Sequence, residues 1–340
     1  MHKAAKRIII ASFSLAVLLL VVCVIFSKQP FQVYALFIIK PFTNMRILRT
    51  IIENTAPLIL CGLGVIVMFR SGNYSLAGEG QVYSAMLGTA VLARYLEIQN
   101  FSAGIELVFS IIGGTILAGV MSIPIAIVGS YKRDNVLLIS FMLSQAIVFI
   151  VDGLIAGPLR DLSNNLVATA SFAARLPIIS SSFPLSIAPL IAIVATLVQW
   201  FFFEHTPSGI MLTLYGRNAV YARLQGYPVW IFSWIPVIIG GLLHGLAGSL
   251  IVTASYGRVI RGMSGGIGWN AIGIALIAAN KPAFIPLAAL LFTWLDTMTQ
   301  YTSALGYISF TNTIVIKALI LLFITSKTTE FHIKKRIPAV

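Results

Sequence analysis

The chain has 340 residues, of which 58% are hydrophobic and 10% are charged, and its mean hydropathy is +0.95. Soluble domains carry about 25% charged residues, so this composition excludes a water-soluble globular protein and indicates an integral membrane protein. The net charge of +13 is typical of membrane proteins whose basic residues gather next to anionic lipid headgroups, so it does not indicate a nucleic-acid-binding protein.

The apolar runs favour helices that cross a bilayer. Several of them reach the roughly 17–25 residues that such a helix needs, and they are too long and too uniformly apolar for the alternating strands of a membrane barrel. We therefore expect an all-α polytopic membrane protein with about ten transmembrane helices. In chain order, the predicted spans lie near residues 8–26, 52–70, 75–94, 104–128, 136–156, 186–203, 229–255, 268–280, 283–300 and 312–326.

The first apolar run has the flanking charges of a signal peptide. MHKAAKR precedes it, but the run is long, and SKQPFQ, which follows it, lacks a small-residue cleavage site. We therefore expect residues 8–26 to remain in the protein as a transmembrane helix.

The distribution of basic residues predicts the orientation in the membrane. An even number of spans places both termini on the same side, together with the loop 129–135 and the segment 204–228. The positive-inside rule makes this side cytoplasmic, although the predicted outer loops carry basic residues too. Basic residues on the predicted cytoplasmic side include Lys3, Lys6, Arg7, Arg217, Arg223, Lys327, Lys334, Lys335 and Arg336.

Two glycine-rich stretches interrupt the apolar pattern. The first interruption is SGNYSLAGEGQ (71–81), and the second is RVIRGMSGGIGWN (258–270). On the predicted topology they face opposite sides of the membrane, which is the mark of inverted repeats, and broken helices in such transporters lie along the substrate pathway. We expect a single transmembrane permease domain over residues 1–340, with a first repeat at about 45–156 and a second at about 229–326.

The two interruptions supply the candidates for the translocation path or its gate. Glu79 is the sharpest of them, because a carboxylate near the apolar zone is costly and usually faces a bundle interior or water. The alternative is that it caps or pairs locally at the cytoplasmic interface. Trp269 could stack on a planar ligand or lie at the membrane interface, where tryptophan is enriched. The full set of candidates is Asn73, Tyr74, Glu79, Gln81, Ser264, Trp269 and Asn270.

Two polar segments lie between the predicted spans. The outer segment, 157–185, is too long for a tight turn, and it either covers an opening to the substrate path or is a connector. The cytoplasmic segment, 204–228, contains NAVYARLQ, which predicts a short amphipathic helix with a glycine on each side. Such a helix either lies on the membrane surface or docks into a groove of a partner.

The sequence lacks the motifs of an enzyme. It has no GxxxxGK[ST] phosphate loop, no cluster with the spacing of metal ligands and no constellation of nucleophile and base. We therefore expect neither catalysis nor a metal site on this chain. His244, Asp296 and Lys317 lie within predicted spans, where they either form structural pairs or relay protons.

Several motifs resemble those of ABC importer permeases of the branched-chain amino-acid, simple-sugar and nucleoside type. GNYSLAGEGQ is similar to their F-N-I-G-x-E-G-Q motif, and YGRNAVYARLQGYPV is similar to their cytoplasmic loop. GLLHGLAGSL and RGMSGGIGWNAIGIALIAANKP resemble two further motifs, with Arg261 and Trp269 in place of the usual proline and phenylalanine. GPLRDLSNN in the outer segment is similar to the nucleoside branch and its riboflavin-transporting relatives. The resemblance covers residues 45–325.

The resemblance implies a subunit of an ATP-driven importer in the bacterial cytoplasmic (inner) membrane. The implied partners are a second homologous permease, ATP-binding subunits, an extracytoplasmic substrate-binding lipoprotein and membrane lipid, but no nucleic acid. The chain itself would hold no cofactor, because ATP and Mg²⁺ would bind the partner ATPase. The segment 204–228 would couple the permease to that ATPase. The residues implied in this coupling are Gly216, Arg217, Asn218, Arg223 and Gly226.

The implied substrate is a nucleoside-like or related planar ribosyl solute, such as riboflavin or a purine nucleoside. Two alternatives stay open. One is a permease for a simple sugar. The other is an ion-coupled secondary transporter that uses Glu79, Asp296 and Lys317, with which inverted repeats are equally compatible. The cytoplasmic helix and the motifs favour the ATP-driven importer.

Overall fold

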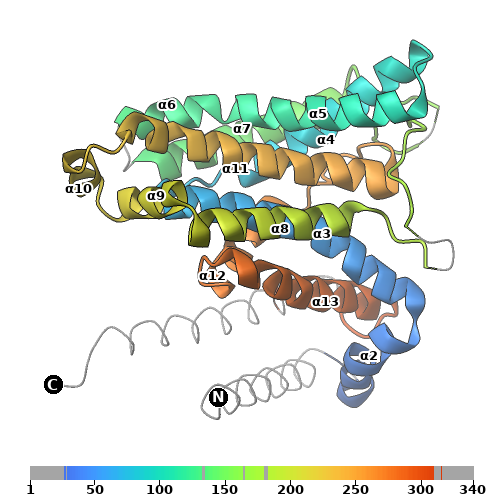
Figure 1. The fold of residues 1–340 in the computed structure, drawn as a ribbon. Coiled ribbons are helices and arrows are strands. Elements are labelled where there is room, and N and C mark those ends of the chain that lie inside the picture. Colours follow the sequence, from blue (N-terminus) through green and yellow to red (C-terminus); the bar gives the residue numbers. More distant parts are fainter. Residues whose placement is uncertain are drawn as a thin grey trace. The chain divides into compact units, whose positions relative to one another are not determined.

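The computed structural model describes residues 27, 29–131, 135–163, 165–179, 183–309 and 315. Over these residues the regular structure is helical, and β-pairing is limited to isolated bridges. The helices, drawn in Figure 1, are α2 (Pro30–Thr43), α3 (Met45–Arg70), α4 (Gly78–Ile98), α5 (Ala103–Met121), α6 (Ile123–Tyr131), α7 (Val136–Ala156), α8 (Ala188–His205), α9 (Pro207–Arg217), α10 (Ala219–Leu224), α11 (Val229–Ile251), the π-helical turn η2 (Val252–Tyr256), α12 (Ile267–Ile277), the 3₁₀ turn η3 (Pro282–Phe284) and α13 (Ile285–Ala304).

The chain divides into two compact units. The larger unit comprises Glu53–Ala289, and the smaller unit takes its residues from Met1–Ile52 and Leu290–Val340. Both interruptions and both polar segments lie in the larger unit, so the candidate site can be described within it.

Among the described residues, six helical stretches are long and apolar enough to cross a membrane. They are Met45–Arg70, Ala103–Gly129, Val136–Ala156, Ala188–His205, Val229–Tyr256 and Pro282–Ala304. The predicted class, an all-α membrane protein, is therefore confirmed, whereas the number of ten spans and the inverted repeats stay predictions. The predicted spans 8–26 and 312–326 lie outside the described residues, except for residue 315.

The prediction and the structure differ at two elements. The prediction of a span at 268–280 is wrong, because α12 has 11 residues and is therefore about 16 Å long, half of the roughly 30 Å hydrocarbon core. The helix α2 was not predicted, since Lys40 and Pro41 interrupt its apolar pattern. Pro30 occupies the first position of α2, where proline is favoured because its missing N–H has no intrahelical partner there.

The core of the larger unit is built around α4, which packs against α5, α7, α11 and α12 (Figure 1). Every residue from Gly78 to Leu87 is buried. Small residues let the backbones approach: a Cβ on Gly114 of α5 would lie 2.7 Å from Ala85 O. Such contacts hold membrane helices together without a hydrophobic driving force. Because protein encloses α4, its sequence tolerates polar side chains that a lipid-facing helix would not.

The smaller unit has its own apolar cluster. Its buried members are Val33, Phe37, Ile47, Ile51, Leu295, Met298 and Ile308. The Trp294 indole N–H donates to Phe37 O at 3.1 Å, so this bond joins α13 to α2 within the cluster.

Candidate functional site

Glu79 joins the two interruptions. Its side chain lies in the first turn of α4 and is only 4% exposed. Oε1 accepts the backbone N–H of Gly266 at 2.9 Å, and Oε2 accepts that of Gly268 at 2.8 Å. Gly266 is the N-cap of α12, so the Glu79 side chain satisfies two N–H groups that a helix start leaves unpaired. It also places an acidic group at the positive end of the α12 dipole.

The first turns of α4 and α12 meet backbone to backbone. A Cβ on Gly268 would lie 2.6 Å from Glu79 Cα, and one on Gly78 would lie 2.7 Å from His244 Nε2. His244 is fully buried on α11, and its Nδ1–H donates to Gly240 O of the same helix at 2.7 Å. The His244 ring therefore packs against Gly78 at this contact. No larger residue fits at Gly78 or Gly268.

Buried side chains fix the first interruption before α4 begins. Asn73 is fully buried, and its Nδ2 donates to Ser71 Oγ at 2.9 Å and to Ser233 O of α11 at 3.1 Å. The Leu76 N–H donates to Ser140 Oγ of α7 at 2.8 Å. Asn73, a predicted path residue, therefore ties the interruption to a neighbouring helix.

The same pattern continues into α4. The Gly80 N–H donates to Ser144 Oγ at 2.9 Å, one helical turn beyond Ser140 on α7. Gln81 is fully buried, and its Nε2 donates to Ser122 Oγ at 2.7 Å, at the junction of α5 and α6. Gln81 therefore reaches a neighbouring helix junction, as Asn73 reaches a neighbouring helix.

The second interruption is held by side chains of neighbouring elements. Gly262 lies at φ 72°, and its N–H donates to Tyr83 Oη at 2.8 Å and to Asp152 Oδ1 at 3.2 Å. The Tyr83 hydroxyl itself donates to Asp152 Oδ1 at 2.6 Å. Arg261 lies 3.9 Å from Asp152, with 58% of its side chain exposed. Tyr83 of α4 and Asp152 of α7 therefore hold this end of the interruption.

The outer segment 157–185 pairs with the second interruption. The Thr169 N–H donates to Val259 O and the Arg261 N–H donates to Val167 O, both at 2.9 Å. Just beyond the segment, Ser186 donates to Glu53 of α3 from both its N–H and its hydroxyl, at 2.6 Å each. The backbone of the segment therefore lies along residues 257–261.

Arg175 of the outer segment packs on the turn that follows α11. Its guanidinium contacts Gly257, where a Cβ would overlap it, and lies 5.4 Å from the centre of the Phe172 ring. Burial lowers the pKa of Arg175, and the positive charge of Arg258 lowers it further, whereas Glu106 raises it.

The remaining path candidates lie around these contacts. The Tyr74 side chain is 55% exposed and its ring centre lies 5.2 Å from that of Phe69 on α3. The Trp269 ring lies 5.4 Å from that of Phe141 on α7. Ser264 is buried, and the Asn270 N–H donates to Gly266 O at 2.9 Å in the first turn of α12.

The segment 204–228, which is predicted to be cytoplasmic, contains two short helices, α9 and α10, at one end of α8 and α11 (Figure 1). Each has a side-chain cap, which explains where it begins. Thr206 Oγ1 accepts the Gly209 N–H at 3.2 Å, and Asn218 Oδ1 accepts the Tyr221 N–H at 2.9 Å. The helix predicted from NAVYARLQ is therefore confirmed as α10.

The helix α10 has apolar side chains exposed on the protein surface. Val220 is 70% exposed and Leu224 is 80% exposed, while Arg217 and Arg223 beside them are exposed as well. Exposed apolar groups rimmed by polar ones are typical of interaction surfaces. Gly226, at φ 74°, ends this stretch.

Arg70, the last residue of α3, connects three parts of this end of the larger unit. Its Nε donates to Asn280 O, just after α12, at 3.0 Å, and its Nη2 lies 3.4 Å from Glu204 Oε1 at the end of α8. Its guanidinium also lies over the Phe203 ring, 4.5 Å from the ring centre. Gly216 of α9 packs on the Arg70 carbonyl, since a Cβ there would lie 2.9 Å from Arg70 C.

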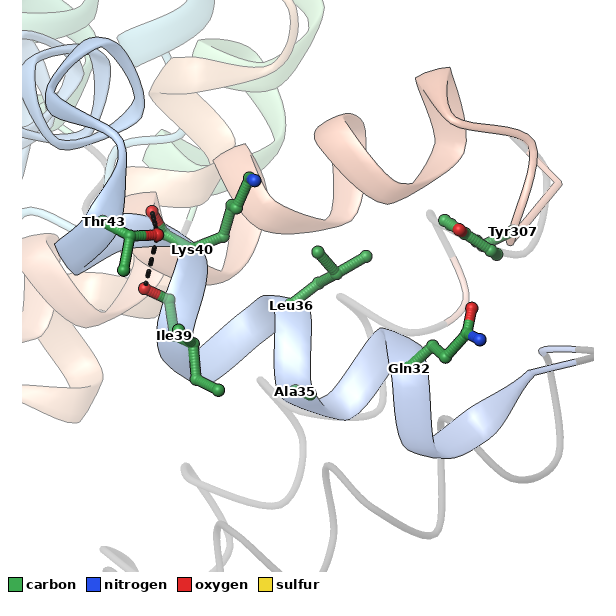
Figure 2. Close-up of a pocket in the computed structure, with 7 residues that line it drawn as sticks. All are labelled: Gln32, Ala35, Leu36, Ile39, Lys40, Thr43 and Tyr307. Atoms are coloured by element: carbon green, nitrogen blue, oxygen red, sulfur yellow. Dashed lines mark hydrogen bonds between the residues drawn. The ribbon is translucent and has the colours of Figure 1, made fainter.

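A separate hollow lies in the smaller unit. Figure 2 shows it along α2, with Tyr307 beside Gln32 at one end and Thr43 at the other. The Thr43 hydroxyl donates to Ile39 O at 3.3 Å and to Lys40 O at 3.4 Å, so these polar groups are used within the helix. The hollow contains none of the predicted path residues.

Comparison with known proteins identifies the family. Residues 47–325 match the family described as the permease component of the branched-chain amino acid transport system. The chain belongs to this permease family. It is 28% identical over 312 residues to the "Probable riboflavin import permease protein RfuC" of Treponema pallidum (strain Nichols), covering 90% of this chain and 81% of that protein.

Two further relatives of the permease carry different substrate names. The "Glucose ABC transporter permease protein TsgB13" of Haloferax volcanii is 25% identical, over 93% of this chain and 85% of that protein. The "Guanosine ABC transporter permease protein NupP" of Bacillus subtilis (strain 168) is 24% identical, over 71% of this chain and 70% of that protein.

Arg70 and Asp152 matter for the geometry of the permease but were not among the predicted site residues. Tyr83 was considered only as an aromatic side chain that could suit a planar base. Arg70 reads as a basic residue at the end of a span, and Asp152 as a carboxylate that reaches water. Only their partners in the fold, up to 210 positions away for Arg70, reveal their roles. Among the described residues no group of three or more His, Cys, Asp or Glu side chains could hold a metal ion.

Proposed function

We propose that this permease is the membrane subunit of an ATP-driven importer, which forms half of the translocation path for a nucleoside-like or related planar ribosyl solute. A second homologous permease forms the other half. Partner subunits bind and hydrolyse ATP with Mg²⁺, and an extracytoplasmic lipoprotein delivers the solute. The chain is a multi-pass protein of the bacterial cytoplasmic membrane with both termini in the cytoplasm.

The observation that carries the proposal is the family match over residues 47–325. The relatives named above as transporter permeases agree with it, and family membership favours an ATP-driven importer over an ion-coupled carrier. ATP hydrolysis then belongs to a partner, because the family describes permease components and not enzymes.

The cytoplasmic surface supports a docking role for the segment 204–228. The helix α10 exposes Val220 and Leu224 beside two arginines, and α9 packs directly on the end of α3 through Gly216. A groove of the ATPase that receives α10 could therefore move α9 and the helix α3 together. Arg217, Arg223 and Gly226 lie on or next to this surface.

The substrate class rests on the relatives. The relative named for riboflavin import matches 90% of this chain. Another relative is named for guanosine, which is a planar base on a ribose. Both names describe a flat ring system attached to a ribose or ribityl chain. The alternative, a simple sugar, is favoured by the relative named for glucose, which matches 93% of this chain.

The path residues are proposed to act in alternating access. ATP-driven closure of the ATPase pair moves the cytoplasmic helices, and the two permease halves rock between outward-open and inward-open states. Such rocking needs an element with two arrangements. Glu79 and the second interruption, with Ser264, Trp269 and Asn270, lie where α4 and α12 begin. We assign the gate to this junction.

The first test is to purify the tagged chain from its native membrane in mild detergent and to identify what comes with it. We expect a second permease, an ATP-binding subunit and a lipoprotein, with ATPase activity in the eluate. The recovered lipoprotein is then titrated with riboflavin, guanosine and glucose. Tightest binding of glucose would favour the sugar alternative, and a chain that elutes alone without ATPase activity would contradict the importer.

The second test addresses the docking surface with a matched pair of exposed leucines. Leu224 of α10 is 80% exposed and Leu162 of the outer segment is 85% exposed. We expect Leu224→Asp to remove the ATPase subunit from the purified complex, because a charge would be buried in the docking groove. Leu162→Asp should leave it in place. Equal retention of the ATPase by both variants would count against α10.

A further inference from the structure

Both ends of α12 are bound by residues of the first interruption or next to it. At its start, Glu79 accepts the N–H groups of Gly266 and Gly268 at 2.9 and 2.8 Å. Just past its end, Arg70 donates from Nε to Asn280 O at 3.0 Å. Arg70 is the last residue of α3 and Glu79 lies in the first turn of α4, so one short stretch of chain grips a helix some 190 residues away.

The charges match the polarity of α12. A helix start carries partial positive charge and a helix end carries partial negative charge, so acidic groups are favourable at the first and basic groups at the second. Glu79 and Arg70 occupy the ends in this favourable order. Reversing the two charges would make both contacts unfavourable.

The distance between the two grips is fixed. The helix α12 has 11 residues, which corresponds to about 16 Å, and the stretch between Arg70 and Glu79 is largely buried. Asn73 bonds to Ser233 O at 3.1 Å and the Leu76 N–H bonds to Ser140 Oγ at 2.8 Å. Because these hydrogen bonds fix the stretch between Arg70 and Glu79 to α7 and α11, this stretch forms a rigid frame that holds both ends of α12.

One grip lies directly under the cytoplasmic helices. Gly216, at the end of α9, packs against the backbone of Arg70 and Gly72, since a Cβ there would lie 2.9 Å from Arg70 C and from Gly72 N. Arg70 also pairs with Glu204 at 3.4 Å, at the end of α8. A displacement of α9 therefore acts directly on Arg70 and Gly72, where the frame begins.

The other grip lies where the second interruption ends. Gly266 is the N-cap of α12 at φ 80°, and the preceding residues lead through Gly262 to the Tyr83–Asp152 pair, whose Gly262 bond to Tyr83 is 2.8 Å. Movement of α12 along its axis would therefore displace the second interruption and the outer segment paired with it.

We propose that Arg70 and Glu79 are positioning residues that clamp the two ends of α12, so that a movement of the cytoplasmic helices is transmitted through α12 to the second interruption. The inference rests on the proposed function, because it describes how ATP hydrolysis is coupled to opening of the path. Without the clamp, ATP is hydrolysed but less solute is moved for each ATP.

The experiment uses the complete complex with its binding protein in proteoliposomes, and it measures solute uptake and ATP hydrolysis together. The variants are Glu79→Gln, Arg70→Gln and the double variant. Glutamine at position 79 keeps one acceptor but presents an NH₂ group to an N–H, and glutamine at position 70 removes the charge. Matched controls are Glu97→Gln and Arg94→Gln, an exposed pair at 2.8 Å within α4.

We expect each clamp variant to lower the number of solute molecules moved per ATP by at least about fivefold, within the range of typical coupling energies, with basal ATP hydrolysis retained. The double variant should lower this ratio little more than the more severe single variant, because the loss of either contact is enough to release α12. Arg70→Lys, which keeps the charge, and Glu79→Asp, which keeps the carboxylate, should give intermediate ratios. The controls should match the wild type.

Several results would overturn the clamp. One is a parallel loss of uptake and ATP hydrolysis with the ratio unchanged, which is what a purely structural role predicts. Another is an effect of the double variant equal to the product of the single effects. If the glutamine variants do not assemble, wild-type ratios in both Arg70→Lys and Glu79→Asp would also refute it. A wild-type complex without ATP-driven uptake would instead contradict the proposed function.

Discussion

The two glycine-rich interruptions look alike in the sequence but are held differently in the fold. The first is largely buried, and its polar side chains reach out to neighbouring helices, as Asn73 reaches Ser233 and Gln81 reaches Ser122. The second is partly exposed, and it is held chiefly by side chains of α4 and α7 that reach towards it.

The backbone shows the same contrast. In the first interruption Gly72 is at positive φ, whereas the second begins just after Gly257 and contains Gly262, Gly265 and Gly266 at φ 72°, 58° and 80°. Left-handed glycines can change conformation at little steric cost. The difference indicates that the first interruption is the frame and that the second is the part whose position depends on that frame.

The largest effect is expected where the two interruptions touch. Gly268→Ala would place a methyl group 2.6 Å from Glu79 Cα, against backbone that cannot turn away. We expect it to destabilise the permease by about 3 kcal/mol, at the upper end of typical overpacking, and to abolish uptake. The measurement is the thermal stability of the purified complex together with its uptake.

The control for Gly268→Ala is Gly104→Ala, where a Cβ would meet nothing within 4 Å. It should have wild-type stability and uptake. Wild-type stability in Gly268→Ala itself would mean that α4 and α12 separate easily, which would contradict a close contact between the interruptions.

A smaller effect is expected at the other end of the second interruption. Tyr83→Phe removes the hydroxyl that donates to Asp152 and accepts from the Gly262 N–H. A buried bond to a charged group contributes about 1.5–3 kcal/mol, and its loss should loosen residues 257–263 alone. Hydrogen exchange of their amides, read by mass spectrometry, should become faster while exchange in residues 71–81 stays unchanged.

Tyr74→Phe provides the control for this loosening, because the Tyr74 side chain is 55% exposed. It should leave exchange in both interruptions unchanged. Faster exchange of residues 71–81 in Tyr83→Phe would show that the two interruptions loosen together, which would contradict their division into frame and dependent part.

The sequence predicted what local chemistry determines. The glycine-rich breaks, the span ends near Arg70 and Ala156, and the short helix at Ala219–Leu224 follow from apolar runs, glycine positions and an asparagine cap. The pairing of Glu79 with Gly266 joins positions 187 residues apart, and no periodicity in the sequence encodes it. Sequence reasoning selected Glu79 because a buried carboxylate is costly, but the fold was needed to identify its partners.

The errors have a related cause. The run 268–280 was predicted to span the membrane because it is apolar, but α12 has only 11 residues and packs against α4. Apolarity alone cannot distinguish lipid from protein surroundings. Conversely, the position of Asp152 near a span end predicts that its carboxylate reaches water. Its side chain is only 22% exposed, since Tyr83 and the second interruption cover it.

A weaker effect is expected at α10, outside both interruptions. Asn218→Ala removes the side-chain oxygen that caps the helix by accepting the Tyr221 N–H, which costs about 1 kcal/mol. A helix of 6 residues then frays, and binding-protein-stimulated ATP hydrolysis should fall while basal hydrolysis stays unchanged. Asn218→Asp keeps the cap and should restore it. Equal losses in both variants would show that the amide itself, and not the cap, is required.

The smallest effect on transport is expected at Gly265, three positions before Gly268. A Cβ on Gly265 would come no closer than 3.8 Å to Met263 O, so space is available and only its φ of 58° favours glycine. Alanine in the left-handed region costs about 1–2 kcal/mol, and asparagine costs less because it tolerates this conformation.

We therefore expect Gly265→Ala to lower stability slightly and to leave uptake close to wild type, with Gly265→Asn milder still. Alanine at Gly265 tests the need for a left-handed backbone, and alanine at Gly268 tests close packing. Comparison of the two variants therefore separates these two effects. If Gly265→Ala blocks uptake as strongly as Gly268→Ala, the second interruption cannot tolerate strain, and its left-handed glycines must keep their conformation throughout the transport cycle. That result would remove the distinction drawn between a fixed first interruption and a movable second one.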